Sequence, residues 1–363
     1  MVVSEIDTPA LLVDLDRLTA NLDRVAHLTR AADLKLRPHT KTHKVPEIAK
    51  LQLERGADGI TVAKIGEAEV MANAGIDDIF IAHEIVGAAK VERLATLAER
   101  AKVSVGVDSM EAATPLSMGF AQHGRRLRVL VEVDVGLRRC GLAPDDVLEF
   151  ARAINTLPGL SLAGIFTYPG QVYDARNENE VAGIAAYECR IMGELGEGIA
   201  RLVEGEIRVS GGSTPTAATY SAACGLTEIR PGSYVFNDRT QIDRWAATPA
   251  DCALTVLATV VSVPEPGRAV LDAGSKSLTT DQARESPGYG MLREDNAAVL
   301  VRLNEEHGIL DLTESDLKLR VADKVQVIPN HACTVSNLFD EMLAVRGGEV
   351  EETWPVAARG MLR

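Results

Sequence analysis

The chain has 363 residues, 46% of them hydrophobic, which is enough for two domains that each bury a core. A formal net charge of −14 and a pI of about 5.1 argue against nucleic acid or an anionic membrane surface as a partner. The acidic N-terminus is unlike a signal peptide, and no uninterrupted apolar run reaches the length of about 18 residues that a membrane span needs. The five cysteines are scattered and form no CxxC pair, which favours reduced thiols over disulfides and predicts a cytoplasmic protein.

Strand-like and helix-like segments alternate through the first two-thirds of the chain. The apolar or β-branched runs cover 34–39, 59–63, 78–82, 102–108, 128–134, 162–168, 206–212 and 228–236. Segments between them, such as 45–57 and 67–75, have the apolar spacing of a helix, although the last gap, 213–227, is shorter and less helical. This alternation predicts an α/β fold, a (β/α)8 TIM-like barrel over residues 16–240, with Asp16 as the candidate N-cap of its first helix. A doubly wound open sheet is the alternative.

The pattern changes after about residue 238. Strand-like runs at 252–263, 267–274, 297–304, 324–332 and 341–350 follow one another with little helical periodicity between them. Residues 241–363 are therefore predicted to form a mostly β domain. The apolar run within residues 1–15 is predicted to add one further strand to it.

Polar residues follow the first predicted barrel strand, in the stretch HTKTHK at 39–44. Barrel enzymes place their sites at these strand ends, where a lysine can form a Schiff base with pyridoxal phosphate. Lys41 lies nearer the strand end than Lys44 and is the better candidate, with His39 and His43 as auxiliary acids or bases. The alternative is an ordinary solvated loop.

The stretch GGSTPT at 211–216 follows the seventh predicted strand, where barrels often bind phosphate. Its glycines let the backbone approach a ligand, and Ser213, Thr214 and Thr216 offer hydroxyls. Pro215 suits the first turn of a helix, whose exposed N–H groups could hold a phosphate. An ordinary glycine–serine turn is the alternative. Tyr168 ends the sixth predicted strand and Tyr234 lies on the eighth.

His331 and Cys333 are two positions apart in the predicted β domain. On a strand they would face the same side, and an imidazole with a thiolate suits a divalent ion, zinc first. A buried thiol beside a hydrogen-bonded histidine is the alternative.

Taken in order, the motifs RPHTKTHK, VDVGLRRCG, GGSTPT, RPGSYVFND, NEEHG, PNHAC and TWPVAARG resemble the D-threonine aldolase and D-serine dehydratase family. These are fold-type III, alanine-racemase-like enzymes that use pyridoxal 5'-phosphate. The resemblance implies that Lys41 holds the cofactor covalently and that Arg139 lies at its pyridine nitrogen. It also implies a phosphate site of Gly212, Ser213, Thr214 and Tyr234, a pocket lined by Tyr168, and a homodimer.

The resemblance further implies that His331 and Cys333 bind a divalent metal (zinc, manganese or magnesium). Such a site would cleave D-3-hydroxy amino acids by a retro-aldol reaction, D-threonine giving glycine and acetaldehyde. The alternative is a dehydratase that converts D-serine or D-3-hydroxyaspartate to a 2-oxo acid and ammonia. The PNHAC motif favours the dehydratase, whereas RPHTKTHK and the segment 337–360 favour the aldolase. His43, Tyr168 and His307 are the candidate catalytic residues besides Lys41.

Two rival classes share some of these features. An alanine racemase would use a β-domain tyrosine as a base, and Tyr289 could be mistaken for it. A non-catalytic pyridoxal-phosphate-binding barrel protein would also have a lysine after the first strand, but that group ends after the barrel. Loss of activity on metal chelation would separate the aldolase from the racemase.

Overall fold

The computed structural model describes residues 1–203 and 205–363. Its contacts divide the chain into two compact units. The barrel unit comprises Val25–Lys41, Ile48–Gly232 and Met361–Arg363, and the β unit comprises Met1–Arg24, Thr42–Glu47 and Ser233–Gly360. The short segment Thr42–Glu47, which directly follows the predicted cofactor lysine in the chain, thus belongs to the β unit.

Within the described residues, the barrel unit contains an eight-stranded parallel sheet. Its strands are β2 (Lys35–Leu36), β3 (Ile60–Val62), β4 (Asp78–Glu84), β5 (Lys102–Val107), β6 (Leu127–Glu132), β7 (Leu160–Phe166), β8 (Arg208–Gly211) and β9 (Glu228–Ile229). The order is β2-β9-β8-β7-β6-β5-β4-β3, and a parallel bridge between His39 and Thr61 joins the two ends. The strands therefore close into the predicted barrel rather than an open sheet.

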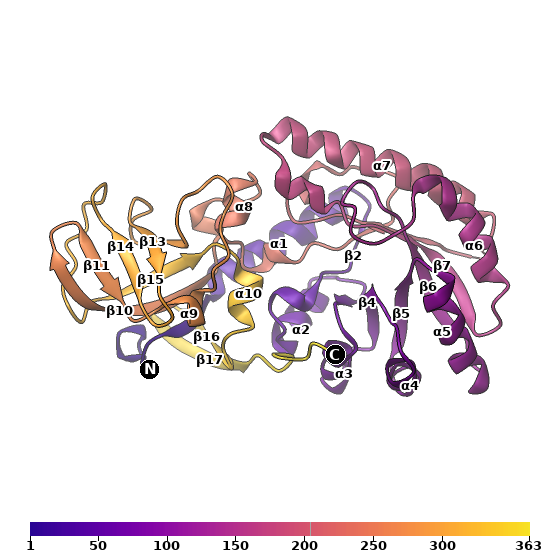
Figure 1. The fold of residues 1–363 in the computed structure, drawn as a ribbon, viewed down its shortest axis with the longest axis horizontal. Coiled ribbons are helices and arrows are strands. Elements are labelled where there is room, and N and C mark those ends of the chain that lie inside the picture. Colours follow the sequence, from indigo (N-terminus) through magenta and orange to yellow (C-terminus); the bar gives the residue numbers. More distant parts are fainter. Residues whose placement is uncertain (204) are drawn as a thin grey trace. The chain divides into compact units, whose positions relative to one another are not determined.

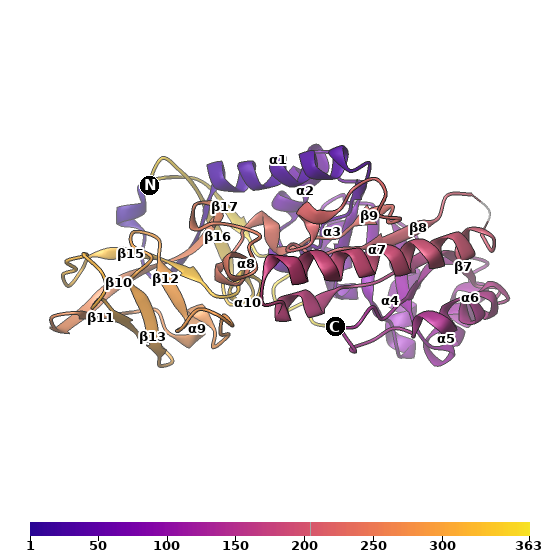
Figure 2. The same ribbon diagram turned by 90° about the horizontal axis from the view of Figure 1, so that it is seen from above.

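The helices of this unit lie outside the strands (Figures 1 and 2). They are α3 (Ile65–Asn73), α4 (Ala88–Leu97), α5 (Met110–Gln122), α6 (Val147–Asn155) and α7 (Glu178–Ala200), with the C-terminal parts of α1 (Leu15–Ala31) and α2 (Pro46–Glu54). The cap of α1 differs from the prediction: Asp14 Oδ1 accepts from the Arg17 N–H at 3.1 Å, and Asp16 lies inside the helix. Among the described residues, none of the helices combines the length and apolarity that crossing a membrane requires.

The barrel interior combines an apolar cluster with buried charges. Phe80 and Phe166 pack edge to face, with ring centroids 5.0 Å apart, beside Leu130. Arg37 donates to Glu228 at 3.0 Å, and both side chains are almost fully buried. Because an unpaired buried charge is strongly destabilising, this pair is expected to stabilise the barrel only while both partners are present.

The β unit contains a nine-stranded sheet, counted over the part of the chain that the structure describes. Its strands are β1 (Ala10–Asp14), β10 (Leu254–Glu265), β11 (Arg268–Leu271), β12 (Gly290–Leu292), β13 (Val299–Leu303), β14 (Gly308–Asp311), β15 (Lys324–Pro329), β16 (Glu341–Arg346) and β17 (Glu349–Pro355). The short helices are α8 (Arg239–Asp243), α9 (Ser275–Leu278) and α10 (Ala332–Ser336). Strand β1, from the N-terminal segment, pairs with both β10 and β16.

The cysteines differ from the sequence-based expectation. Cys189 on α7 and Cys224 in the loop after β8 form a disulfide, whereas Cys140, Cys252 and Cys333 are free. The prediction of reduced thiols is therefore wrong for this pair. The two cysteines are 35 positions apart, and only the packing of the loop on α7 brings them together.

Candidate active site

Three of the predicted cofactor residues lie together at the C-terminal ends of the barrel strands. Lys41 lies in the single turn of 3₁₀ helix Thr40–Thr42 after β2, Arg139 follows β6, and Tyr168 follows β7. The Lys41 Nζ is 5.6 Å from the centroid of the Tyr168 ring, and the Arg139 Cζ is 5.3 Å from it. Both distances suit cation–π contacts, so one aromatic ring holds the two cations. The structure thus brings Lys41, Arg139 and Tyr168 to one place.

Arg139 lies near Glu132, which forms a carboxyl pair with Glu84 that the sequence analysis missed. The Glu132 carboxylate lies 4.0 Å from the Arg139 guanidinium, and burial, together with the adjacent Glu84, raises the pKa of Glu132 to about 9. A hydrogen bond from His83 lowers the pKa of Glu84 to about 2. The pair therefore shares one proton at neutral pH. With Cys140 these side chains place their ligand atoms within 4.8 Å of one another.

The predicted phosphate loop begins at Gly212, whose backbone requires glycine. Its φ is +80°, and an added Cβ would lie 3.0 Å from the Cβ of Ile229. The prediction that Pro215 opens a helix is wrong, because residues 214–216 form a turn that leads into a single 3₁₀ turn, Ala217–Thr219. Ser213 and Thr214 are buried in this turn. A tight, left-handed glycine turn with buried hydroxyls fits a phosphate group.

A buried network holds this turn and was not predicted. The Gly212 N–H donates to Glu188 Oε1 at 2.7 Å, and the Tyr220 hydroxyl donates to Glu188 Oε2 at 2.5 Å. Tyr220 also contacts Thr216 Oγ1 at 2.6 Å, which accepts the Ser213 N–H at 3.0 Å. Burial raises the pKa of Glu188 to about 7.

The sequence contained one signal for Glu188. It occupies a position on the buried stripe of α7, where the helical spacing otherwise places small or apolar residues. The other members of this stripe are Val181, Ala185, Met192, Leu195, Gly196 and Ile199. An acid in such a stripe indicates a specific polar partner, although the sequence does not say which one.

Tyr234 lies away from the strand on which it was predicted. Strand β9 ends at Ile229, and Tyr234 is in the 3₁₀ turn Ser233–Val235. It is 2% exposed and belongs to the β unit, whereas Gly212 belongs to the barrel unit. Its contact with a phosphate stays a prediction.

The predicted metal pair is not on a strand. Strand β15 ends at Pro329, His331 is the N-cap of α10, and Cys333 is the second residue of that helix. The chain enters helix α10 at Ala332, so the two residues do not share a strand. The two side chains nevertheless interact directly, since a hydrogen bond joins His331 to Cys333.

The electrostatics of this pair favour a thiolate beside an imidazolium. Burial opposes both charges, but the Cys333 thiolate and Asp238 raise the pKa of His331 to about 10. His331 in turn lowers the pKa of Cys333. The Nδ1 of His331 lies 2.9 Å from Asp281 Oδ2, and the Sγ of Cys333 lies 3.2 Å from Thr42 Oγ1. Asp281 is 50 positions from His331, so no sequence spacing indicated it.

The two remaining candidate catalytic histidines differ in exposure. His43 is fully buried in the β unit, where its Nδ1 accepts the Val45 N–H at 3.1 Å and its ring meets Phe236 edge to face. His307 is exposed in the turn between β13 and β14. Their catalytic roles stay predictions.

Comparisons with known proteins agree with this geometry. Residues 13–240 match the family model described as "Alanine racemase, N-terminal domain", and residues 253–345 match "Putative serine dehydratase domain". The chain is 36% identical to a D-threonine aldolase of an Arthrobacter species, over 99% of this chain and 95% of that protein. It is 31% identical to a D-threo-3-hydroxyaspartate dehydratase of a Delftia species, over 96% and 97%.

The crystal structure of D-threonine aldolase from Filomicrobium marinum superposes with a TM-score of 0.92 at 34% identity, covering 99% of this chain and 98% of that one. The similarity therefore extends through both units of the fold and is not confined to one motif. The chain belongs to the alanine-racemase-like family that includes D-threonine aldolases and D-threo-3-hydroxyaspartate dehydratases.

Proposed function

We propose that this protein is a pyridoxal-phosphate- and metal-dependent lyase that cleaves D-3-hydroxy amino acids by a retro-aldol reaction. D-Threonine would give glycine and acetaldehyde. The observation that carries the proposal is the convergence of Lys41 and Arg139 on the Tyr168 ring at the strand ends. The similarity to a D-threonine aldolase over nearly the whole chain supports the substrate class.

The residues present fit pyridoxal phosphate. Lys41 offers an amine for covalent attachment, and the turn at Gly212–Thr214 offers a tight backbone and buried hydroxyls for the phosphate. When bound, the cofactor supplies an electron sink for negative charge at the α-carbon of an amino acid. The Nζ of Lys41 would also be the group that accepts or donates a proton at the substrate. The guanidinium of Arg139 stays charged and disfavours protonation of a ring nitrogen that faces it.

The donor set of His331 and Cys333 fits a divalent ion. One imidazole and one thiolate form a borderline-soft pair, which zinc accepts best among the common ions. Two protein donors leave positions for water and for an oxygen of the substrate, where the ion would act as a Lewis acid. Asp281 would orient His331 through its Nδ1, which leaves the Nε2 for the metal.

The test is an assay of the purified protein with pyridoxal phosphate, a divalent metal and D-threonine, with and without a chelator. Glycine and acetaldehyde, lost on chelation, are the expected products. L-Threonine is the matched control and should remain intact. No product from D-threonine or D-serine, despite a lysine-linked cofactor, would contradict the proposed chemistry.

A dehydratase is the second candidate, and Cys333 is the observation that favours it. A thiolate in this motif is more typical of the dehydratases than of the aldolases, and the Delftia relative is named a dehydratase. A dehydratase would remove the α-proton and expel the β-hydroxyl. In the same assay it would release 2-oxobutanoate and ammonia.

The proposal also covers the oligomeric state and the cellular compartment of the protein. Two copies are proposed to pair as a homodimer, as the family resemblance implies, and a cytoplasmic location is proposed from the composition of the chain. Light scattering coupled to size-exclusion chromatography tests the first point, because a mass near 38.9 kDa, that of one chain, would exclude the dimer.

A further inference from the structure

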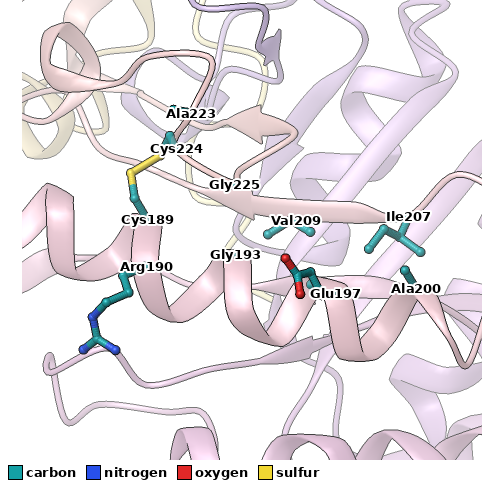
Figure 3. A pocket seen from close by; sticks show the side chains of 11 residues that line it. Cys189, Arg190, Gly193, Glu197, Ala200, Ile207, Val209, Ala223, Cys224 and Gly225 are labelled. Atoms are coloured by element: carbon teal, nitrogen blue, oxygen red, sulfur yellow. A yellow bond between two sulfur atoms is a disulfide. The ribbon is translucent and has the colours of Figure 1, made fainter.

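The loop after β8 is fastened to helix α7 at both of its ends. At its beginning, the Gly212 N–H donates to Glu188 Oε1. At its end, Cys224 is disulfide-bonded to Cys189. Glu188 and Cys189 are consecutive residues of α7, so a single turn of the helix makes both attachments. Figure 3 shows the disulfide between α7 and the loop.

The second attachment brings the backbones of loop and helix unusually close. A Cβ at Gly225 would lie 2.7 Å from the Cα of Gly193, and the φ of Gly225 is +75°. Glycine is therefore required on the loop beside the disulfide, and Gly193 presents no side chain to oppose it (Figure 3). Because the two backbones approach so closely, a small movement of the loop end away from α7 would separate Gly225 from Gly193.

Tyr220 connects the two attachments to the predicted phosphate loop that begins at Gly212. Tyr220, which lies between Gly212 and Cys224 in the chain, donates to Glu188 and contacts Thr216. Thr216 in turn accepts the Ser213 N–H. Movement of the loop end would therefore displace Tyr220 and, through Thr216, the backbone at Ser213.

The disulfide is accessible to a reductant. Cys189 is partly exposed, and both cysteines line a surface pocket of about 490 Å³ (Figure 3). The predicted cofactor lysine, Lys41, is on a different strand end of the barrel. Reduction can therefore reach the loop without chemistry at the lysine.

We propose that α7 positions the cofactor's phosphate loop through Glu188 and the Cys189–Cys224 disulfide, so that reduction of the disulfide weakens retention of the cofactor. The inference rests on the proposed function, since it takes the turn at Gly212–Thr214 as the phosphate site. Glu188 and the disulfide act as positioning groups, because neither is assigned a contact with the cofactor itself.

The reduction is chemically simple. A water-soluble phosphine attacks one sulfur, the S–S bond breaks, and water supplies the oxygen of the phosphine oxide and the two protons of the thiols. The phosphine loses two electrons and the disulfide gains them.

The first measurement counts thiols in the denatured, untreated protein. Three are expected, from Cys140, Cys252 and Cys333, and five would overturn the proposal. The phosphine-treated protein, freed of reductant, is then compared with the untreated holoenzyme for the dissociation constant of pyridoxal phosphate. If reduction leaves the buried Gly212 N–H without its acceptor, affinity should fall by roughly 5- to 150-fold. Equal affinity in the two states would overturn the proposal.

Variants distinguish an effect on the position of the phosphate loop from a general loss of protein stability. The double variant Cys189→Ser with Cys224→Ser should bind the cofactor as weakly as the reduced protein and should not respond to phosphine. Glu188→Leu removes both acceptors and should weaken cofactor binding, whereas Glu188→Gln retains an acceptor for Gly212 and should restore most of it. Glu197→Gln, on the exposed part of α7, is the matched control and should bind the cofactor normally.

The outcomes also distinguish this inference from the proposed function. If the untreated protein forms no lysine-linked cofactor and has no activity on D-threonine, the proposed function fails. If it is active and holds the cofactor equally well after reduction, only the positioning by α7 fails. Should the double variant not fold, the comparison of the reduced and oxidised wild-type protein still decides.

Discussion

Replacing Glu188 with glutamine should change how the free energy of unfolding depends on pH. Burial raises the pKa of this carboxyl from 4.5 to about 7, so the folded protein keeps a proton that the unfolded chain releases between these values. Because the folded-state pKa is the higher one, the stabilisation is complete below about pH 4.5 and is lost as the pH rises to about 7. At 1.36 kcal/mol for each pH unit, the loss is about 3 kcal/mol.

The assay is urea unfolding of the cofactor-free wild-type and Glu188→Gln proteins at intervals from pH 4.5 to pH 8. The free energy of the wild type minus that of the variant should fall by about 3 kcal/mol up to pH 7 and stay constant above it. Other carboxyls contribute equally to both proteins and cancel in the difference. A difference that does not vary with pH would show that folding leaves the pKa of Glu188 unchanged, and it would refute the argument from burial.

Three further predictions concern the lysine, the metal pair and the barrel interior. Lys41→Ala should abolish covalent attachment of pyridoxal phosphate; mass spectrometry after borohydride reduction would contradict this if it found the cofactor on another lysine. Cys333→Ser should weaken zinc binding by at least about 100-fold, measured by titration with a competing chelator, because a direct ligand matters more than its supporting partner. Unchanged affinity would remove Cys333 from the site. Arg37→Met should destabilise the protein by about 3–5 kcal/mol in urea unfolding, because it removes the guanidinium that pairs with the buried Glu228 carboxylate; adding Glu228→Gln should recover most of this loss.

The sequence by itself determined the architecture and the position of the lysine loop. Eight apolar, β-branched runs separated by helical periodicity are local patterns, and all eight correspond to strands β2–β9. The position of Lys41 followed from them, because the end of a strand is visible in the sequence. The β-rich pattern after residue 238 and the strand within residues 1–15 were found in the same way. Local physics sufficed here, since alternation and helical spacing depend only on near neighbours.

Tertiary structure alone decided which distant side chains meet. Arg139, Tyr168 and Lys41 are far apart in the sequence, and only the arrangement of the barrel strands brings the Tyr168 ring into contact with both cations. It also could not show that His331 and Cys333 meet at a helix start, that Asp281 supports His331, or that Cys189 pairs with Cys224. These contacts join residues 29 or more positions apart, or depend on where a strand ends. Burial, charge and thiol pairing are properties of the packed neighbourhood, which no local pattern encodes.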